Sequence, residues 1–184
     1  MTIERLDTEL VKISQQLSSL TVEIASHGGG GSGFIWSADG LIVTNAHVIK
    51  SSQVKVKLRD KTIAEGSAIA RDDSKDLAAI QIQASNLPTP TIRNASVRPG
   101  EIVLAMGSPW GFKGTLTKGI VHTTYWQADR ASAVIIADIR LAPGNSGGIL
   151  ADAEGRVIGI NTAIYNGLAL AIPIQQIQNF VESL

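Results

Sequence analysis

Residues 34–172 consist mainly of short apolar runs separated by turn signals, and this pattern limits the folds open to the chain. Val54, Val56 and Leu58 alternate with lysines, as expected for a strand with one face in solvent. The other runs are GFIWS, LIVT, LAAIQI, EIVLAM, TLTKGIVHT, AVIIADI, RVIGINT and LALAI. Because no helices of useful length lie between the runs, the pattern predicts a mainly β fold of antiparallel sandwiches or barrels.

Both ends of the chain are predicted to be helical. Apolar residues recur at helical spacing near the start: Leu6, Leu10, Ile13, Leu17 and Leu20. This stripe must be covered either by the domain's own surface or by copies of itself. At the other end, Pro173 suits a first helical turn, and Ile174, Ile177 and Val181 share one face, so we expect a closing helix packed on the second half of the β region.

The segment 84–99 holds three of the chain's six prolines and has no clean periodicity. It is predicted to connect two β halves. The expected divisions are therefore an N-terminal helix at 1–20, a first half at 21–95, a second half at 96–172 and a C-terminal helix at 173–184. The run HGGGGSG at 27–33 is predicted to be a flexible loop, because it lacks the lysine and the helix that a phosphate-binding loop requires.

Composition excludes several classes of function. The chain has 16 basic and 16 acidic residues and no block of like charge, so nucleic acid and anionic membranes are not expected partners. It has no cysteine, which excludes disulfides, thiolate metal sites and cysteine nucleophiles. No apolar run approaches the roughly 20 residues of a membrane span, and the start lacks a signal peptide. A cytoplasmic location is expected for the chain as written, with export as the alternative if a leader was removed.

Ser146 lies in the sequence Gly-Asn-Ser-Gly-Gly at 144–148 and is a candidate nucleophile. A nucleophilic serine needs a tight turn whose backbone N–H groups point at the developing oxyanion, and glycines permit such a turn. The alternative is an ordinary glycine-rich hairpin with a solvated serine. The same residues fit the Gly-x-Ser-x-Gly elbow of α/β-hydrolases, but there the histidine follows the serine, whereas His27, His47 and His122 all precede Ser146. An α/β-hydrolase is therefore excluded.

His47 is the candidate general base, because it follows the apolar run LIVT at a point where the chain turns. His27 lies in the glycine run and His122 in a strand-like stretch. A catalytic histidine needs an orienting carboxylate that is buried and hydrogen-bonded. Asp76 abuts LAAIQI, where an unpaired charge would cost several kcal/mol, and is the first candidate. Asp138, within AVIIADI, is the second on the same argument.

These candidates lie in segments that together resemble a known family. TNAHV at 44–48, DLA at 76–78 and GNSGG at 144–148 occur in the order His, Asp, Ser. The chain resembles the trypsin-like serine endopeptidases, and specifically the protease domain of the HtrA (Deg) group. Further matches are GSGF at 31–34, ADG at 38–40, TKGIV at 117–121 and VIGINT at 157–162, so that the resemblance covers about residues 31–175.

The resemblance implies a trypsin-like double antiparallel β-barrel with the active site in the crevice between the barrels. His47 and Asp76 would come from the first barrel and Ser146 from the second. Ser146 would attack the scissile carbonyl and form an acyl-enzyme, and the backbone N–H groups of Gly144 and Ser146 would form the oxyanion hole. No cofactor and no metal ion is implied.

The resemblance also implies a substrate pocket, and here the sequence departs from the group at some positions. Leu141 and Ile164 would wall the pocket for the residue on the acyl side of the scissile bond, which implies small or medium aliphatic residues. Arg140 departs from the group, which usually has a small residue there, and would favour acidic residues if it points into the pocket. No PDZ domain follows Leu184, so we expect either a minimal member or an isolated protease domain. In the group, an N-terminal segment commonly builds a trimer, and the helix at 1–20 is a candidate for that contact.

Two functions are consistent with these residues. The first is a serine endopeptidase that cleaves unfolded or flexible polypeptides. The second is a catalytically silent trypsin-like scaffold that acts as a polypeptide-binding or holdase module. The presence of all three triad residue types favours the first, because a pure binding module has no need of a buried carboxylate directed at a histidine.

Overall fold

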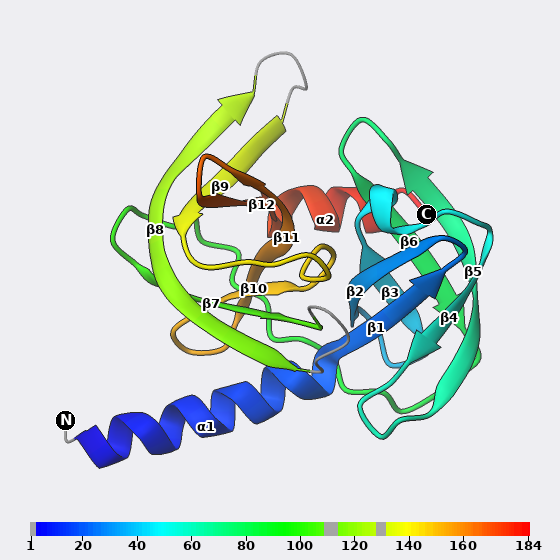
Figure 1. The fold of residues 1–184 in the computed structure, drawn as a ribbon, viewed down its shortest axis with the longest axis horizontal. Coiled ribbons are helices and arrows are strands. Elements are labelled where there is room, and N and C mark those ends of the chain that lie inside the picture. The colour runs from blue at the N-terminus through cyan, green and yellow to red at the C-terminus, as the bar shows by residue number, and fades with distance from the viewer. Residues whose placement is uncertain (1–2, 109–113, 128–131) are drawn as a thin grey trace.

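The computed structural model describes residues 3–108, 114–127 and 132–184. Residues 1–2 of the expected first helix, and residues 109–113 and 128–131 of the expected second barrel, lie outside these ranges. The described residues form two closed antiparallel barrels, with one helix at each end of the chain (Figure 1). The predicted fold class, a mainly β double barrel with terminal helices, is confirmed.

The first barrel has the strand order β1-β2-β3-β6-β5-β4. Its strands are β1 (Thr21–Ser26), β2 (Gly29–Ile35), β3 (Leu41–Thr44), β4 (Gln53–Lys57), β5 (Ile63–Asp72) and β6 (Leu77–Ile82). In β4 the side chains of Val54 and Val56 are buried and that of Lys55 is exposed, as the alternation predicts. The buried valines point into the barrel, so the pattern fixes which face of the sheet closes around the core.

The second barrel has the strand order β10-β11-β12-β9-β8-β7. Its strands are β7 (Ile102–Gly107), β8 (Thr115–Gln127), β9 (Ser132–Asp138), β10 (Ile149–Asp152), β11 (Val157–Tyr165) and β12 (Leu168–Pro173). All four residues of β10 are buried, and so are five consecutive residues of β7. These strands face the barrel core on one side and the first barrel on the other, which is why their sequences are apolar without alternation.

A shared apolar core joins the two barrels. It contains Phe34 and Leu77 from the first barrel and Leu104 and Ile160 from the second, all fully buried. Burial of this kind contributes roughly 1.5–3 kcal/mol for each large side chain. The interface is therefore packed like a domain interior, and it holds the two halves of any site between the barrels in a fixed relation.

Both terminal helices pack on this shared core. In α1 (Ile3–Leu20), Leu17 and Leu20 are buried, but Leu6 is 42% exposed, so the domain's own surface covers only the later part of the stripe. In α2 (Ile174–Glu182), Ile174 and Ile177 are buried. This helix contacts β11 and β12 of the second barrel, and it also contacts β6 of the first. Neither helix of the described chain is long and apolar enough to cross a membrane.

The glycine run is a correction to the sequence prediction. Residues 29–33 are not a flexible loop but the start of β2, and they pair with β1 from Ser26 back to Val22. Glycine has no side chain, so a strand built from it shows no alternation in the sequence. The packing explains the composition, because a Cβ at Gly31 would meet the carbonyl oxygen of Ser146 at 2.9 Å. The sequence pattern also misses β1 and β5.

The proline-containing segment lies between β6 and β7 and is bound to the second barrel by charges. Arg93 lies 2.8 Å from Glu101 and 3.6 Å from Asp152. Arg98 lies 2.6 Å from Glu101, and Arg156 lies 2.7 Å from Asp152. The two arginines beside Glu101 lower the pKa of its carboxyl to about 2, with the hydrogen bond from Arg93 as the largest cause.

Candidate active site

His47 is held at the end of β3 by a single 3₁₀ turn, η1 (Ala46–Val48). The side chains of Ala46 and Val48 are buried in the first barrel, and the His47 side chain between them is 47% exposed. The buried neighbours fix the backbone of the turn. The imidazole is therefore presented to solvent from a rigid base.

Asp76 immediately precedes β6 and is in direct contact with His47. His47 Nδ1 lies 2.9 Å from both Asp76 carboxylate oxygens, and the His47 backbone N–H donates to Asp76 Oδ1 at 3.0 Å. Burial alone would raise the pKa of the Asp76 carboxyl, but the hydrogen bonds from His47 and Thr162 outweigh burial and lower that pKa. An ionised Asp76 is only an acceptor, so Nδ1 carries the proton and Nε2 is left free to accept one.

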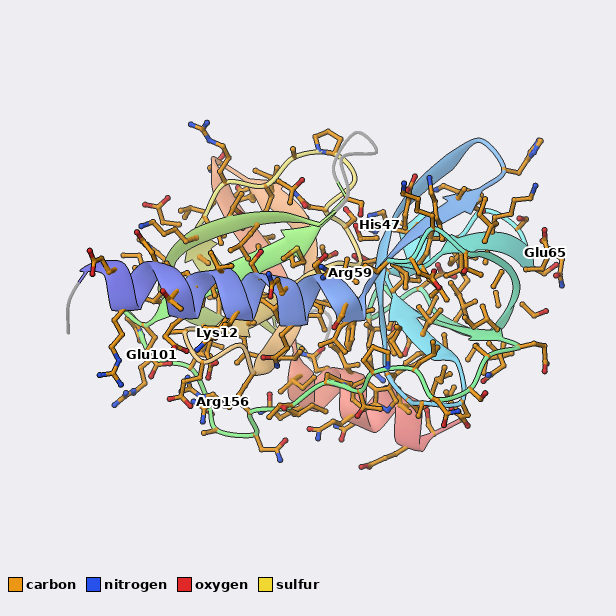
Figure 2. The ribbon with its side chains drawn as sticks, turned by 90° about the horizontal axis from the view of Figure 1, so that it is seen from below. Lys12, His47, Arg59, Glu65, Glu101 and Arg156 are labelled. Atoms are coloured by element: carbon orange, nitrogen blue, oxygen red, sulfur yellow. The ribbon has the colours of Figure 1, made fainter. Side chains whose placement is uncertain are left out.

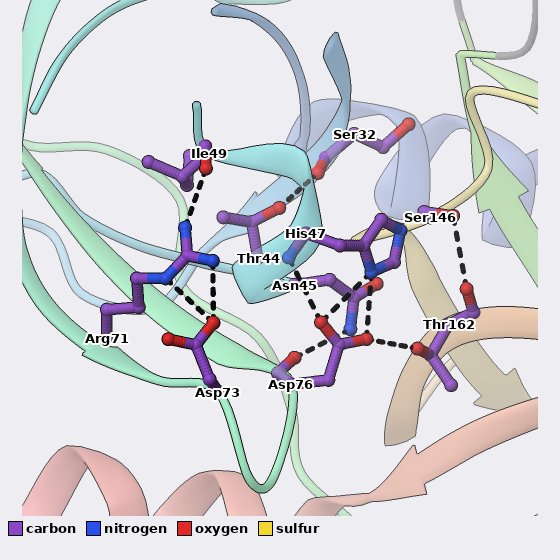
Figure 3. A network of polar contacts seen from close by, with 10 residues as sticks. All are labelled: Ser32, Thr44, Asn45, His47, Ile49, Arg71, Asp73, Asp76, Ser146 and Thr162. Atoms are coloured by element: carbon purple, nitrogen blue, oxygen red, sulfur yellow. Dashed lines mark hydrogen bonds and ion pairs between the residues drawn. The ribbon is translucent and has the colours of Figure 1, made fainter. Parts of the chain in front are cut away.

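The backbone at Asp76 is itself unusual. Asp76 has a φ of 55°, in the left-handed region that costs a non-glycine residue roughly 1–2 kcal/mol. The buried Asn45 side chain donates through Nδ2 to the Asp76 carbonyl oxygen at 3.0 Å, which holds this conformation (Figure 3). Asn45, which lies two residues before His47, thus also fixes the backbone of the aspartate that His47 contacts.

Ser146 lies in the turn that leads into β10. Its hydroxyl donates to the carbonyl oxygen of Thr162 at 3.2 Å, and in the part of the chain that the structure describes it has no hydrogen bond to His47 (Figure 3). Thr162 in turn donates through Oγ1 to Asp76 Oδ2 at 2.5 Å. Thr162 therefore links the serine to the histidine–aspartate pair. Rotation of Ser146 about χ1 moves its hydroxyl between staggered positions.

The turn around Ser146 depends on glycines. Gly144 has a φ of 101° and Gly147 a φ of 83°, and both values lie in the left-handed region. The N–H of Gly147 donates to Asn161 and the N–H of Asn145 to Ala142. Within the described residues, the N–H groups of Gly144 and Ser146 have no such acceptor. Two backbone donors beside the serine are therefore available to an oxyanion.

Thr162 is a residue of the site that the sequence reasoning did not single out. The segment 157–162 matched the family, but nothing in the local pattern of β11 marks the threonine side chain. Its partner Asp76 is 86 positions away in the chain. The only sequence signal was its place inside a matched segment.

The other candidate residues are dispersed. His27, His122 and Asp138 are all exposed and lie in the β1–β2 turn, in β8 and at the end of β9. Asp138, the second candidate for the orienting carboxylate, therefore lacks the burial on which it was chosen. No group of His, Asp and Glu that could hold a metal ion is found among the described residues.

The expected pocket residues lie on the segments that flank Ser146 and Thr162. Leu141 is partly buried against the core of the second barrel, and Ile164 on β11 is 52% exposed. Arg140 is exposed. A cavity is lined by His47, Asp76 and Thr162. Its lining also includes Lys50, Arg71 and Lys75. Figure 2 shows His47 at the surface of the first barrel, above α1 in that view.

Comparison with known proteins gives a consistent result. Residues 31–160 match the family described as trypsin-like peptidase domain. The chain is 42% identical over 167 residues to the putative serine protease HhoB of Synechocystis sp., covering 85% of this chain and 40% of that protein. It is 38% identical over 164 residues to a probable periplasmic serine endoprotease DegP-like of Pseudomonas fulva, covering 84% and 34%. It thus spans about two fifths or less of the length of these relatives.

Solved structures agree with the sequence relatives. The crystal structure of the serine endoprotease from Yersinia pestis has a TM-score of 0.86 at 31% identity, covering 94% of this chain and 65% of that one. The HtrA-type protease AlgW with tripeptide has a TM-score of 0.87 at 33% identity, covering 94% and 62%. The chain belongs to the family of trypsin-like peptidase domains, and it is homologous to the HtrA and DegP serine proteases over about 85% of its length.

Proposed function

We propose that the chain is a serine endopeptidase in which Ser146, His47 and Asp76 form the catalytic triad. The observation that carries the proposal is the contact of His47 Nδ1 with the ionised Asp76 carboxylate at 2.9 Å, joined through Thr162 to Ser146. In this proposal, Nε2 takes the Ser146 proton as Oγ bonds to the scissile carbonyl carbon. The imidazolium then gives that proton to the leaving amine, and the acyl-enzyme forms.

The second half of the reaction uses the same groups. Water gives a proton to His47 Nε2 while its oxygen bonds to the acyl carbon, and the proton returns to Ser146 Oγ as the acid product leaves. The oxyanion of each tetrahedral intermediate accepts hydrogen bonds from the N–H groups of Gly144 and Ser146. One such donor is worth roughly 3–4 kcal/mol of barrier in comparable sites.

We assign the pocket on the acyl side to Leu141 and Ile164, and we expect small or medium aliphatic residues there. Arg140 is exposed, and its guanidinium can stay in solvent, so we do not assign it to the pocket. Unfolded or flexible polypeptides are the proposed substrates by analogy with the family.

For assembly, we propose a trimer through α1. Leu6 and Val11 are 42% and 56% exposed on this helix, which projects past the second barrel (Figure 1). Sedimentation equilibrium of the intact chain should give a trimer, and the double substitution Leu6→Glu and Val11→Glu should give a monomer. A monomeric intact chain would contradict the proposal. Of the two locations considered, we propose export, because the relatives include probable periplasmic serine endoproteases.

The second candidate is the silent polypeptide-binding scaffold. One observation favours it: the Ser146 hydroxyl donates to Thr162 and not to His47. A serine held in this way is not activated by the base. The two candidates differ in whether the hydroxyl rotates toward His47 when a substrate is present.

Labelling with a serine-directed fluorophosphonate, followed by peptide mapping, tests the proposal. We expect label on the Ser146 peptide only, and cleavage of casein by the intact chain. The matched control is Ser146→Ala, which should abolish labelling and lower kcat on the scale of about 10⁶ seen when a serine-protease nucleophile is removed. Casein binding without labelling or cleavage would favour the scaffold, and labelling of a different serine would contradict the triad.

A further inference from the structure

Ser32 belongs to the GSGF segment at 31–34 and lies on β2, and the catalytic roles proposed above do not use it. Its side chain is completely buried, with a relative exposure of 0%. A buried hydroxyl costs about 1–3 kcal/mol if its hydrogen bonds are not made. The partners of this hydroxyl therefore indicate its role.

The Ser32 hydroxyl connects the first barrel to two segments of the second. It donates to the carbonyl oxygen of Gly144 at 2.7 Å, and it accepts from the backbone N–H of Ser108 at 2.9 Å. Ser108 immediately follows β7, and Gly144 lies in the turn that carries Ser146. One side chain of the first barrel thus fixes the position of the serine turn relative to the end of β7.

The backbone of Ser32 holds the same turn at a second point. Its N–H donates to the carbonyl oxygen of Ser146 at 2.8 Å. Close packing reinforces this contact, because a Cβ at Gly147 would collide with the carbonyl oxygen of Ser32. Figure 3 shows Ser32 beside Thr44, whose hydroxyl donates to the Ser32 carbonyl oxygen at 2.7 Å.

These bonds determine how the peptide groups of the turn are oriented. In a trans peptide group the C=O and the N–H point in opposite directions. The Gly144–Asn145 peptide is held by Ser32 Oγ at its carbonyl and by Ala142 at its N–H, and the Ser146–Gly147 peptide by Ser32 N and Asn161. The N–H of Ser146 lies in the peptide between these two, and the N–H of Gly144 in the peptide just before them.

We propose that the Ser32 hydroxyl is a positioning group for the oxyanion hole. By fixing the Gly144 carbonyl, it aims the N–H groups of Gly144 and Ser146 at the position of the substrate's carbonyl oxygen. This inference rests on the proposed function. The first barrel, which supplies His47 and Asp76, would then also position the turn of the second barrel that carries the oxyanion-hole N–H groups.

Gly144 explains why one hydroxyl matters here. A glycine at a φ of 101° has no Cβ to restrict it to this conformation. Without the Ser32 hydroxyl, the Gly144 carbonyl and the Ser108 N–H both lose a buried partner. The peptide groups next to Gly144 are then free to reorient, and the donors no longer converge.

The test compares Ser32→Ala with Ser26→Ala. Ser26 is a matched control because it is a buried serine on the neighbouring strand whose hydroxyl accepts a backbone N–H, that of Lys50, at 2.8 Å. Ser32→Ala should lower kcat on fluorescein-labelled casein by about 10- to 100-fold, less than the roughly 10²- to 10³-fold loss for a removed donor. Ser26→Ala should leave kcat close to that of the wild type.

Three further measurements distinguish positioning from a general loss of structure. The rate of fluorophosphonate labelling should fall by a similar factor, because the phosphoryl oxygen enters the same hole. The affinity for casein, measured in the Ser146→Ala background, should not change. The pH at which kcat is half-maximal should also stay constant, because Ser32 is neutral and does not touch His47 or Asp76.

The results also separate this inference from the function on which it rests. Equal effects of Ser32→Ala and Ser26→Ala in an active enzyme, or a loss carried by KM alone, would overturn the role of Ser32 and leave the triad intact. A wild type that neither labels nor cleaves would overturn both. If Ser32→Ala does not fold, as judged by circular dichroism, Ser32→Cys provides the same comparison with a smaller fall in kcat, since a thiol is a weaker donor.

Discussion

The two halves of the candidate site are held by different kinds of interaction. On the first barrel, His47 and Asp76 are held by side-chain hydrogen bonds and by charge. On the second barrel, the turn around Ser146 is held by backbone hydrogen bonds and by glycines with positive φ. The geometry of the first half therefore depends on the hydrogen-bonding atoms of its side chains. The geometry of the second half depends on the space around its backbone.

This difference predicts how each half responds to change. A substitution that alters charge or tautomer in the first half should change chemistry and leave the fold intact. A substitution that adds even one methyl group in the second half should move the turn. Thr162 lies on β11 of the second barrel, but its hydroxyl donates to Asp76 in the first half of the site. A substitution of Thr162 therefore tests to which half this residue belongs functionally.

Among the substitutions that compare the two halves, Asp76→Asn in the first half should have the largest effect. An amide nitrogen facing Nδ1 favours the wrong imidazole tautomer, and kcat should fall by about 10⁴, as in comparable triads. The matched control is Asp73→Asn, because Asp73 is a nearby carboxylate that pairs with Arg71 at 2.6 Å and not with His47. We expect casein cleavage to persist in Asp73→Asn. Equal losses in both variants would mean that general charge matters and the specific contact does not.

Gly147→Ala tests the second half. Gly147 has a φ of 83°, and a Cβ there would collide with the Ser32 carbonyl and the Thr44 hydroxyl. Gly100→Ala is the control, because Gly100 has a φ of 88° and nothing lies within 4 Å of the added atom. Strain alone costs each variant about 1 kcal/mol. We expect Gly147→Ala to lose at least about tenfold in kcat because the oxyanion donors move.

Urea denaturation and casein cleavage should be measured on both glycine variants. Gly100→Ala should show only the small loss of stability and retain activity. If Gly147→Ala were as active as Gly100→Ala, the turn would tolerate displacement, and the contrast between the two halves would fail.

A smaller effect is expected for Thr162→Val. This change keeps the shape of the side chain and removes the hydroxyl that donates to Asp76 Oδ2. The hydrogen bond from Thr162 helps to lower the pKa of Asp76, so its loss raises that pKa, and the acidic limb of the rate profile should move to higher pH. At pH 8 we expect less than about a tenfold loss in kcat, because His47 Nδ1 still contacts both carboxylate oxygens of Asp76. An unmoved profile would place Thr162 outside the first half.

The sequence predicted the parts of the site that depend on residue type. Serine among glycines, histidine at the end of an apolar strand and aspartate beside a core strand each have a local signature. Thr162, Asn45 and Ser32 have none, because their roles arise from partners that lie 86, 31 and 112 positions away in the chain. A contact between distant segments is fixed by the packing of the barrels and cannot be read from a local pattern.

The same limit explains the errors in the fold. Alternating apolar residues revealed β4, because each buried side chain was large. The start of β2 was missed because glycines carry no pattern, and β5 because small residues such as Ala64 and Ser67 occupy many of its positions. Both strands are held in the sheet by backbone hydrogen bonds to their neighbours, and these bonds leave no pattern in the side chains.

The smallest effect concerns a carboxylate outside the site. The pKa of Glu101 is lowered to about 2, and the pKa of Asp76 is also lowered. The partners of Glu101 are Arg93 and Arg98, however, and arginines do not exchange protons near neutral pH. Because the folded pKa lies below the ordinary value of 4.5, Glu101 stabilises the fold above about pH 4.5, and this contribution is lost as the pH falls toward 2. Solvent screens the ion pair of Glu101 with the exposed Arg98, so we expect Glu101 to contribute about 1 kcal/mol to the free energy of unfolding.

Urea denaturation of the wild type and of Glu101→Gln at pH 7 and pH 3 measures this contribution. The difference in free energy of unfolding between the two proteins should be larger at pH 7 than at pH 3, while casein cleavage at pH 7 stays the same. Asp76→Asn should show the opposite result, with cleavage lost and little change in the free energy of unfolding, because burial offsets much of what its hydrogen bonds contribute. If Glu101→Gln lost activity without losing stability, Glu101 would serve catalysis as Asp76 does. The partner of each carboxylate, arginine or histidine, would then not predict whether it serves stability or catalysis.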